Sequence, residues 1–410
     1  MQLRDYQQNI ALQGVEILKE FQLLYLAMQV RTGKTITALQ IAKLYGASKV
    51  LFVTKLKAIS SIKKDFEAIN PKFDIYVVNY ESLHTIDTNY DFIILDEAHC
   101  LGQYPQPAER VKELKRIAAN KPIIYLSGTP TPESYSQFYH QFYISSFSPF
   151  VEKKFYEWHK NYGIPAIKFL YNRQINDYSK IKKEAIMDKI QHLIISFTQE
   201  DAGFTSYVEE EIIRLPMPTK IKWAIDKLRK DKIIVTKGNK VILADTAVKE
   251  MNKVHQLCGG TVKTEESEAM VIDMSKADYI KEKFAGQKIA IYYKYVAELA
   301  ALQFAFAERI FYDPMQFNKA GVDAVFVSQV QSGREGVNLS SADCLVMYNI
   351  DYSAVSYWQV RARLQTKDRV KDAKVYWLFF EGGIEEKIYN CVEQKKDFTL
   401  SHYKKLLKKP

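Results

Sequence analysis

The chain has 410 residues, with 58 Lys and Arg against 48 Asp and Glu and with 47% hydrophobic residues. It is long enough for two or three hydrophobic cores, because single cores rarely grow beyond about 250–300 residues. This composition excludes a disordered or fibrous protein. The 4 cysteines form no Cys-x-x-Cys pair and no cluster with histidine. That spacing excludes a disulfide framework and a zinc site as the basis of the fold.

Neither a membrane segment nor a secretory signal is expected. No apolar run approaches the roughly 18 residues that a membrane span needs, and the opening Met1-Gln2-Leu3-Arg4-Asp5 lacks an apolar signal core. We therefore expect a cytoplasmic protein. The net charge of +10 is concentrated in residues 217–270 and 359–410, and it is compatible with an anionic partner.

Short apolar runs rich in β-branched and aromatic residues alternate with stretches of helix length. This alternation is typical of βαβ units around a buried parallel sheet. Because this alternation of apolar runs and helix-length stretches occurs in both halves of the chain, we predict two α/β domains with parallel sheets. The runs cover residues 49–53, 74–79, 91–95 and 122–126 in the first half, and 288–293, 309–312, 323–327, 344–348 and 374–380 in the second.

The segment between the two halves reads as mostly helical. Residues 151–216 carry Lys, Tyr, Phe and Ile at helical spacing, and a second helical pair around Lys237-Gly238-Asn239 extends this segment towards residue 270. The predicted organisation is an N-terminal domain at 1–150, a helical insertion at 151–270, a C-terminal domain at 271–400 and a basic tail at 401–410.

A phosphate-binding loop is indicated by Arg31-Thr32-Gly33-Lys34-Thr35, which follows an apolar run and opens a helix. Backbone N–H groups at a helix N-terminus attract phosphate, Lys34 can reach the β- and γ-phosphates, and the Thr35 hydroxyl suits Mg²⁺. The full pattern has glycine where Met28 stands, so a chance Gly-Lys-Thr remains an alternative for this motif taken alone.

Two adjacent acids follow the run at 91–95, in the sequence Asp96-Glu97-Ala98-His99. Open parallel sheets bind their ligands at the carboxyl ends of strands. An Asp in this place can hold Mg²⁺, and the neighbouring Glu can orient and deprotonate an attacking water. Together with Gly-Lys-Thr upstream, the acid pair indicates hydrolysis of a nucleoside triphosphate.

In the order of these elements the chain resembles the superfamily 2 helicases and translocases. The resemblance covers residues 1–395 and implies an α/β fold of two tandem RecA-like parallel-sheet domains with a mostly helical insertion between them. The motifs that match are the Q motif at 3–7, motif I at 31–35, motif II at 96–99, motif III at 126–130, motif IV at 288–295, motif V at 331–339 and motif VI at 359–363.

Weaker matches are similar to the Swi/Snf-type DNA translocases and to compact phage helicases. The matching segments are Asn79-Tyr80-Glu81-Ser82-Leu83, Val254-His255-Gln256-Leu257-Cys258, Ser275-Lys276 and Gly336-Val337-Asn338-Leu339. The Lys-, Ile- and Tyr-rich composition, together with the lack of an appended domain, suggests the cytoplasm of a bacterium or of a phage-infected host.

The resemblance implies ATP and Mg²⁺ as cofactors and assigns roles to individual residues. Catalytic roles fall to Lys34, Asp96, Glu97, Gln359 and Arg363, the last as an arginine finger. Nucleotide contacts fall to Tyr6, Gln7, Arg31, Thr32, Gly33, Lys34, Thr35, Gly336 and Arg363. Thr35 and Asp96 are expected to bind Mg²⁺, and the residues expected to couple hydrolysis to movement are His99, Ser127 and Thr129.

Contacts with the nucleic-acid backbone are expected where motifs Ia, Ib, IV and V follow strand ends. A lysine beside a strand end can also be a solvated surface charge. The prediction therefore rests on the fact that all these residues lie at the ends of strands. The many tyrosines and phenylalanines are better explained by core packing than by base stacking. The expected contacts are Thr54, Lys55, Asn79, Tyr80, Lys294, Ser328 and Gln331.

The predicted function is an ATP-dependent DNA helicase or translocase in replication, recombination or repair. Its partners would be duplex, forked or single-stranded DNA and replication or recombination proteins, and we expect a monomer. The family usually has Gly where Arg31 stands and a second arginine where Thr366 stands. Two alternatives therefore stay open: a nucleic-acid-binding protein with impaired ATPase, and an RNA helicase.

Overall fold

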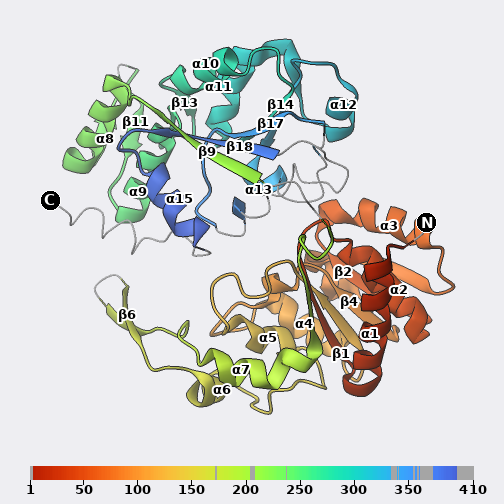
Figure 1. Ribbon diagram of the computed structural model, residues 1–410. Helices are drawn as coiled ribbons and strands as arrows, with labels where there is room; N and C mark the ends of the chain where they lie inside the picture. Colours follow the sequence, from red (N-terminus) through yellow and green to blue (C-terminus); the bar gives the residue numbers. More distant parts are fainter. Residues whose placement is uncertain are drawn as a thin grey trace. The chain divides into compact units, whose positions relative to one another are not determined.

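The computed structural model describes residues 3–170, 173–203, 208–236, 238–333, 339, 341–353, 356–357, 360 and 373–394. The chain divides into two compact units, Met1–Phe204 and Thr205–Pro410. Each unit contains a six-stranded sheet whose neighbouring strands all run parallel (Figure 1). The predicted fold class, α/β with two tandem parallel-sheet domains, is confirmed.

The sheet of the first unit has the strand order β3-β2-β4-β5-β1-β8. Its central strands are buried on both faces, which explains their near-continuous apolar sequences. The four predicted strands correspond to β2 to β5. The strands are β1 (Leu23–Met28), β2 (Lys49–Thr54), β3 (Asp74–Asn79), β4 (Phe92–Leu95), β5 (Ile123–Leu126) and β8 (Ile194–Phe197).

Two groups of helices cover the two faces of this sheet, because alternate side chains of each strand point to opposite faces. On one face, Leu24 and Phe52 pack against α1 (Asp5–Phe21), α2 (Lys34–Tyr45) and α3 (Ile59–Ile69). On the other face, Tyr25 and Val53 pack against α4 (Glu109–Ile117), α5 (Gln137–Tyr143), α6 (Phe155–Tyr162) and α7 (Lys183–Ile190).

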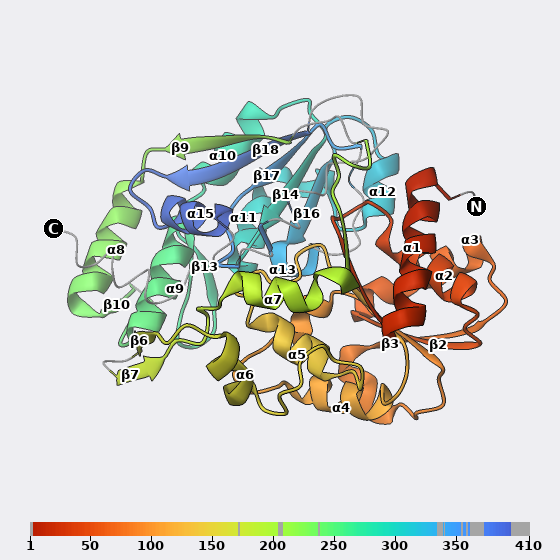
Figure 2. The same cartoon turned by 60° about the horizontal axis from the view of Figure 1, so that its bottom comes forward.

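An antiparallel hairpin, β6 (Ile167–Leu170) and β7 (Arg173–Asn176), extends from the first unit away from its sheet (Figures 1 and 2). Short 3₁₀ turns complete the connections of both units. These turns are η1 (Leu56–Ala58), η2 (Tyr80–Thr85), η3 (Ala98–Leu101), η4 (Gln191–Leu193) and η5 (Ala307–Arg309).

The sheet of the second unit has the strand order β15-β16-β14-β17-β18-β9. The five strands predicted in this half are all present. The strands are β9 (Val208–Leu215), β14 (Ile289–Tyr293), β15 (Ile310–Phe311), β16 (Val325–Gln329), β17 (Cys344–Met347) and β18 (Ala373–Phe380).

Helices again cover both faces of the second sheet. One face packs against α8 (Thr219–Asp231), α9 (Ala247–Cys258), α12 (Pro314–Lys319) and α15 (Glu385–Glu393). The other packs against α10 (Ser275–Lys283) and α11 (Val296–Phe306). The remaining elements are α13 (Val330–Gly333) and two antiparallel pairs, β10 (Ile233–Val235) with β11 (Val241–Leu243), and β12 (Thr261–Lys263) with β13 (Ala269–Val271).

The segment 151–270, predicted as one helical insertion, is shared between the two units. It supplies α6 to α9, but β8 joins the first sheet and β9 joins the second. Strand β9 is an edge strand, and its Glu209 and Glu211 are exposed. Half-exposed edge strands lack the continuous apolar run that marks a buried parallel strand, which explains why the sequence did not reveal this one.

Among the described residues, no helix combines the length and the apolar character that crossing a membrane requires.

A buried ion pair joins the start of α10 to the start of α15 in the second unit. The Nζ atom of Lys276 lies 2.9 Å from Oε1 of Glu385 and also donates to the carbonyl oxygens of Tyr348 (3.2 Å) and Leu378 (2.9 Å). Both charged side chains are almost completely buried. Removing one partner would leave the other charge buried and uncompensated.

We expect Lys276→Met to lower the free energy of unfolding of the second unit by about 3–5 kcal/mol, because Glu385 would stay buried without its cation. Urea unfolding of the purified variant measures this loss. Lys281→Met on the exposed face of the same helix is the matched control, with a change within about 0.5 kcal/mol. A Lys276→Met variant as stable as this control would contradict the prediction.

Candidate active site

The predicted phosphate-binding loop connects β1 to α2. Gly33, the residue before α2, has φ +84°, and a Cβ atom there would lie 2.1 Å from Nε2 of Gln7. Glycine is therefore required at this position. Arg31 also adopts a left-handed conformation, with φ 65°, which costs a non-glycine residue about 1–2 kcal/mol. This backbone conformation explains why glycine suits position 31, although this chain has arginine there.

The start of α1 lies over this loop, as the resemblance implied for Tyr6 and Gln7. The Tyr6 hydroxyl donates to the carbonyl oxygen of Thr32 at 3.0 Å, and its ring stacks on Phe197 with centroids 4.7 Å apart. Gln7 is buried, and its Oε1 accepts from the Arg4 amide at 3.0 Å. The structure brings the predicted nucleotide contacts of the first unit together.

The segment after β8 also holds the loop, and the sequence reasoning missed it. The Gln29 amide donates to the carbonyl of Phe197 at 2.9 Å. The Gln199 amide donates to Oε1 of Gln29 at 2.9 Å, and its side chain donates to the carbonyl of Val30 at 3.1 Å. Because β8 follows β1 by more than a hundred residues and matches no motif, only the sheet pairing reveals these contacts.

The acid pair stands at the carboxyl end of β4, as predicted. The Thr54 hydroxyl donates to Oδ2 of Asp96 at 2.8 Å, and the Tyr80 hydroxyl donates to the carbonyl oxygen of Asp96 at 2.6 Å. Glu97 has φ 49°, a left-handed conformation that is unusual for a side-chain-bearing residue. The strand end and its neighbours therefore fix the backbone of both acids.

The predicted coupling residues form a connected chain of hydrogen bonds. The Nδ1 atom of His99 lies 3.2 Å from Oε2 of Glu97 and 3.1 Å from Oγ of Ser127. Ser127 Oγ in turn accepts from the Thr129 amide at 3.1 Å. A change at the Glu97 carboxylate therefore has a direct path of contacts to the motif III loop.

Burial and mutual repulsion separate the pKa values of the two acids. Burial, followed by the neighbouring charge of Glu97, raises the pKa of Asp96 to about 6, although the Thr54 hydrogen bond and Lys34 oppose this shift. Burial would also raise the pKa of Glu97, but the hydrogen bond and charge of His99, with the charges of Lys34 and Lys55, hold it well below its usual range. Glu97 therefore loses its proton at a lower pH than Asp96.

The donor set at this strand end fits a magnesium ion. Mg²⁺ prefers hard oxygen ligands, usually one or two carboxylates with water and substrate phosphates. The Asp96 carboxylate and the Thr35 hydroxyl are such donors, and two adjacent carboxylates out of water favour a cation. In the described part of the chain, no three His, Cys, Asp or Glu side chains gather as a metal cluster.

Motif III is anchored from α5 by residues that the sequence did not single out. The Tyr25 hydroxyl donates to Oε1 of Gln141 at 2.7 Å, and Nε2 of Gln141 donates to the carbonyl of Pro130 at 2.9 Å. A Cβ atom on Gly128 would lie 3.7 Å from Nζ of Lys34. The motif III loop therefore lies beside Lys34, at a distance where an added Cβ would make an ordinary van der Waals contact.

Two of the predicted nucleic-acid contacts in the first unit are corrected by their burial. Thr54 is fully buried and Tyr80 is 3% exposed, and both hydroxyls are bonded to Asp96. Their side chains support the acid pair and do not face a ligand backbone. Lys55 and Asn79 are half-buried at the ends of β2 and β3, and their contact with nucleic acid stays a prediction.

In the second unit Lys294 is also corrected. Its side chain is 8% exposed, forms an ion pair with Asp351 and lies over the Tyr352 ring at 4.3 Å. This ion pair neutralises the positive charge of Lys294, which was expected to contact a backbone phosphate. Ser328 is half-buried and Gln331 is exposed, and both remain predicted contacts.

Three predicted residues lie outside the described part of the chain: Gly336 of motif V, and Gln359 and Arg363 of motif VI. Their nucleotide and catalytic roles stay predictions.

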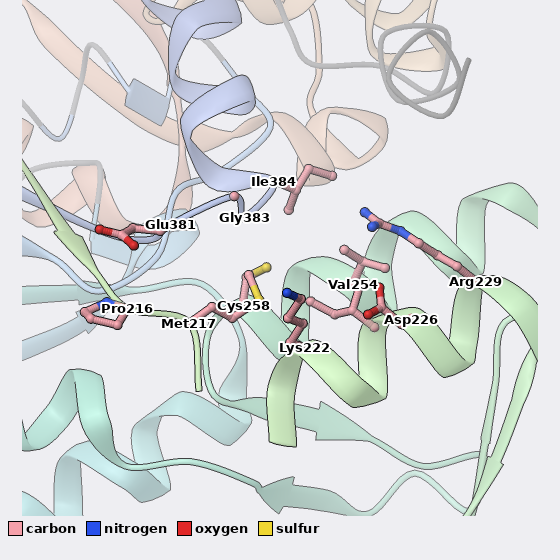
Figure 3. Close-up of a pocket in the computed structure, with 12 residues that line it drawn as sticks. Pro216, Met217, Lys222, Asp226, Arg229, Val254, Cys258, Glu381, Gly383 and Ile384 are labelled. Atoms are coloured by element: carbon pink, nitrogen blue, oxygen red, sulfur yellow. The ribbon is translucent and has the colours of Figure 1, made fainter. Parts of the chain in front are cut away.

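The second unit also contains a cavity of about 440 Å³ between α8, α9 and the turn after β18. Figure 3 shows Lys222, Asp226 and Arg229 extending from α8, with Glu381 on the opposite side. Charges of both signs line this cavity, and no predicted site residue does. The cavity therefore adds nothing to the nucleotide site of the first unit.

Residues 1–132 match the family model described as type III restriction enzyme, res subunit. The CHD3-type chromatin-remodeling factor CHR7 of Arabidopsis thaliana is 20% identical over 370 residues, which is 80% of this chain and 29% of that protein. Chromodomain-helicase-DNA-binding protein 1 of Homo sapiens is 32% identical over 87 residues, 21% of this chain and 5% of that protein. The chain thus spans less than a third of these relatives.

A further match is Helicase SWR1 of Mycosarcoma maydis, 30% identical over 81 residues, which is 20% of this chain and 4% of that protein. The solved Sulfolobus solfataricus SWI2/SNF2 ATPase core in complex with dsDNA aligns with a TM-score of 0.44 and 16% identity, over 96% of this chain and 91% of that chain.

We expect Thr54→Val to raise the Mg²⁺ concentration for half-maximal ATP hydrolysis about threefold at pH 6.5 and to leave it unchanged at pH 8.5. The Thr54 hydrogen bond favours ionised Asp96, so its loss raises the pKa of this carboxyl further, and near neutral pH Mg²⁺ must displace a proton more often. At pH 8.5 both proteins have an ionised carboxylate.

Titration of Mg²⁺ against hydrolysis rate at the two pH values measures this effect. Thr85→Val is the matched control, since Thr85 is exposed and its hydroxyl bonds only to the carbonyl of Ser82 among the contacts described. An equal Mg²⁺ requirement in Thr54→Val and wild type at pH 6.5 would show that this bond does not tune Asp96.

Proposed function

We propose that the chain is a superfamily 2 helicase or translocase that hydrolyses ATP to move along DNA. The half-buried acid pair Asp96–Glu97, facing the loop of Lys34 and linked through His99 to motif III, is the observation that carries this proposal. The relatives named for chromatin remodeling and DNA binding support DNA as the track.

Different residues of the first unit would bind the phosphates, hold the base and activate the attacking water. The amides at the start of α2 and the Lys34 ammonium would bind the phosphates, while Tyr6 and Gln7 would hold the base. Glu97, kept ionised by His99, would orient the attacking water and accept its proton. Thr35 and Asp96 would hold Mg²⁺, which would supply positive charge against the phosphate oxygens. Arg363 is proposed as the arginine finger from the resemblance alone.

For hydrolysis to drive movement, a structural change at the nucleotide site must alter the residues that contact nucleic acid. The contacts from Glu97 through His99 and Ser127 to Thr129 provide such a route within the first unit. Lys55 and Asn79 stand at the ends of β2 and β3, on the side of β4 away from β5 in this sheet. The Thr54 and Tyr80 hydroxyls, which are bonded to Asp96, connect the acid pair to the ends of β2 and β3. A shift at the acid pair would therefore reach the residues beside the proposed track. The proposed process is replication, recombination or repair.

We expect Lys34→Ala and Glu97→Gln each to reduce DNA-stimulated ATP hydrolysis by about 10²–10⁴-fold, for different reasons. Lys34→Ala removes a phosphate contact and should weaken binding of a fluorescent ATP analogue, whereas Glu97→Gln removes the proton acceptor and should leave that binding intact. Lys43→Ala, an exposed position on the same helix as Lys34, is the control. Wild-type turnover in either variant would refute the site.

We expect duplex DNA to stimulate hydrolysis, with an affinity that falls steeply as salt rises, because backbone phosphate contacts release counterions. The measurement is the ATPase rate with single-stranded, double-stranded and forked DNA and with duplex RNA, across a salt series. Greater stimulation by RNA would favour an RNA helicase. Tight DNA binding without turnover would favour a protein with impaired ATPase, and equal rates with and without every nucleic acid would exclude a motor.

A further inference from the structure

A compact turn follows β8 at the end of the first unit. The Thr198 amide and hydroxyl each donate to Oδ2 of Asp201 at 2.8 Å, and the Asp201 amide donates back to Oγ1 of Thr198 at 3.1 Å. The amide of Ala202, which is buried, donates to the Thr198 carbonyl at 3.2 Å. Because the bonds between Thr198 and Asp201 are reciprocal, they fix the backbone between them, as in a capping box. The first residue that this turn holds in place is Gln199.

Gln199 donates two hydrogen bonds to the phosphate-binding loop. Its Nε2 atom lies 3.1 Å from the carbonyl oxygen of Val30, and its main-chain amide lies 2.9 Å from Oε1 of Gln29. Two residues earlier, the carbonyl oxygen of Phe197 accepts from the Gln29 amide at 2.9 Å. We call the two hydrogen bonds of Gln199 the Gln199 brace. The brace holds the two residues that precede Arg31.

The carbonyl oxygen of Gln29 holds the residues that follow Arg31. It accepts from the Thr32 amide at 3.4 Å and from the Thr32 hydroxyl at 2.8 Å. The Nζ atom of Lys34 donates to the same oxygen at 3.4 Å. Gln29 is therefore bonded to Gln199 on one side and to Thr32 and the phosphate-binding lysine on the other.

Arg31 lies between two peptide groups that these contacts hold. Its φ of 65° is in the left-handed region, which a residue with a side chain adopts at an energetic cost. Because each peptide group is planar, rotation about φ of Arg31 turns the Val30 carbonyl, and rotation about ψ turns the Thr32 amide. The first rotation breaks the bond to Gln199, and the second breaks the bond to Gln29. Such contacts are what allows a strained backbone conformation to persist.

We propose that Gln199 is a positioning residue for the phosphate-binding loop, and that its brace keeps Arg31 in the left-handed conformation in which the loop receives phosphate. This inference rests on the proposed function, because it requires that the loop bind ATP. It gives a role to a residue outside the motifs that the sequence showed. It also explains how the chain accommodates an arginine where the backbone favours glycine. Gln199 acts through Val30 and Gln29 and does not itself contact the nucleotide.

Gln199→Ala is the central test, with Glu200→Ala as its control. Glu200 is the next residue of the same turn and is exposed, and among the described contacts it takes part only through its main-chain carbonyl, which accepts from the Gly203 amide. Gln199→Ala removes the bond to Val30, so a smaller fraction of the protein has the loop in its binding conformation. We expect the Kd for a fluorescent ATP analogue to rise about 3- to 10-fold, the effect of one hydrogen bond. In Glu200→Ala it should stay within about twofold of wild type.

Arg31→Gly separates a positioning role from general damage to the turn. Glycine adopts positive φ without the cost that a Cβ atom adds, so a loop with this substitution needs the brace less. We expect Gln199→Ala to raise the Kd less than about twofold when Arg31→Gly is already present, because two residues that act on the same conformational equilibrium are not additive. Binding of the analogue to the single and double variants measures this difference.

Gln29→Ala provides an independent test, because it removes the other bond of the brace and leaves the main-chain contacts of position 29 in place. We expect a rise in Kd in the same range, about 3- to 10-fold. In steady-state hydrolysis the loss should appear in the KM for ATP and not in kcat, as for a change in binding alone. Circular dichroism and thermal unfolding identify a folding defect. If Gln199→Ala does not fold, Gln29→Ala, with and without Arg31→Gly, decides the outcome.

The two proposals fail in different ways, because binding of the analogue is measured without DNA. Wild-type protein that binds the analogue but shows no DNA-stimulated hydrolysis would overturn the proposed function alone, and wild type that binds no nucleotide would overturn both proposals. A folded Gln199→Ala variant that binds as tightly as Glu200→Ala would overturn the positioning role. An equal loss of binding with and without Arg31→Gly would also overturn it, since the brace would then not act on the conformation of Arg31.

Discussion

Two adjacent carboxylates, Asp96 and Glu97, stand largely out of water at the end of β4, and burying such charge is costly unless it is paired or hydrogen-bonded. Four neighbouring side chains offset this cost: the Thr54 hydroxyl, the Lys34 and Lys55 ammonium groups and the His99 ring. Each favours the ionised form of at least one acid. Lys34 and His99 are also assigned roles in the proposed hydrolysis, so the groups that stabilise the acid pair would also prepare it for that reaction.

The strand order brings these partners to one edge of the sheet. Strand β4 lies between β2 and β5, and β5 lies beside β1. Thr54 ends β2, Ser127 follows β5, and the phosphate-binding loop follows β1. Because all these strands are parallel, their carboxyl ends meet at one edge. The contact of His99 with both Glu97 and Ser127 follows from this order, since the loops after β4 and β5 are neighbours.

The sequence predicted the strands and the central residues of the site because these carry local signals: apolar runs, Gly-Lys-Thr, and two acids after a buried strand. It could not predict which way a side chain at a strand end points. Thr54 and Tyr80 turned inward to Asp96, and Lys294 pairs with Asp351, which is 57 residues away. Phe197 and Gln199 were missed because their role depends on the pairing of β8 with β1.

The buried charges also change what the net charge of +10 means. Lys276 and Lys294 each form a buried pair with an acid, and neither can attract a phosphate while it does so. Glu210 accepts from three neutral donors, so its charge is spread over their hydrogen bonds. A count of lysines near motifs therefore says little about the track for DNA. Exposed positions such as Gln331 and half-buried ones such as Lys55 and Asn79 are the predicted places for the proposed contact with backbone phosphates.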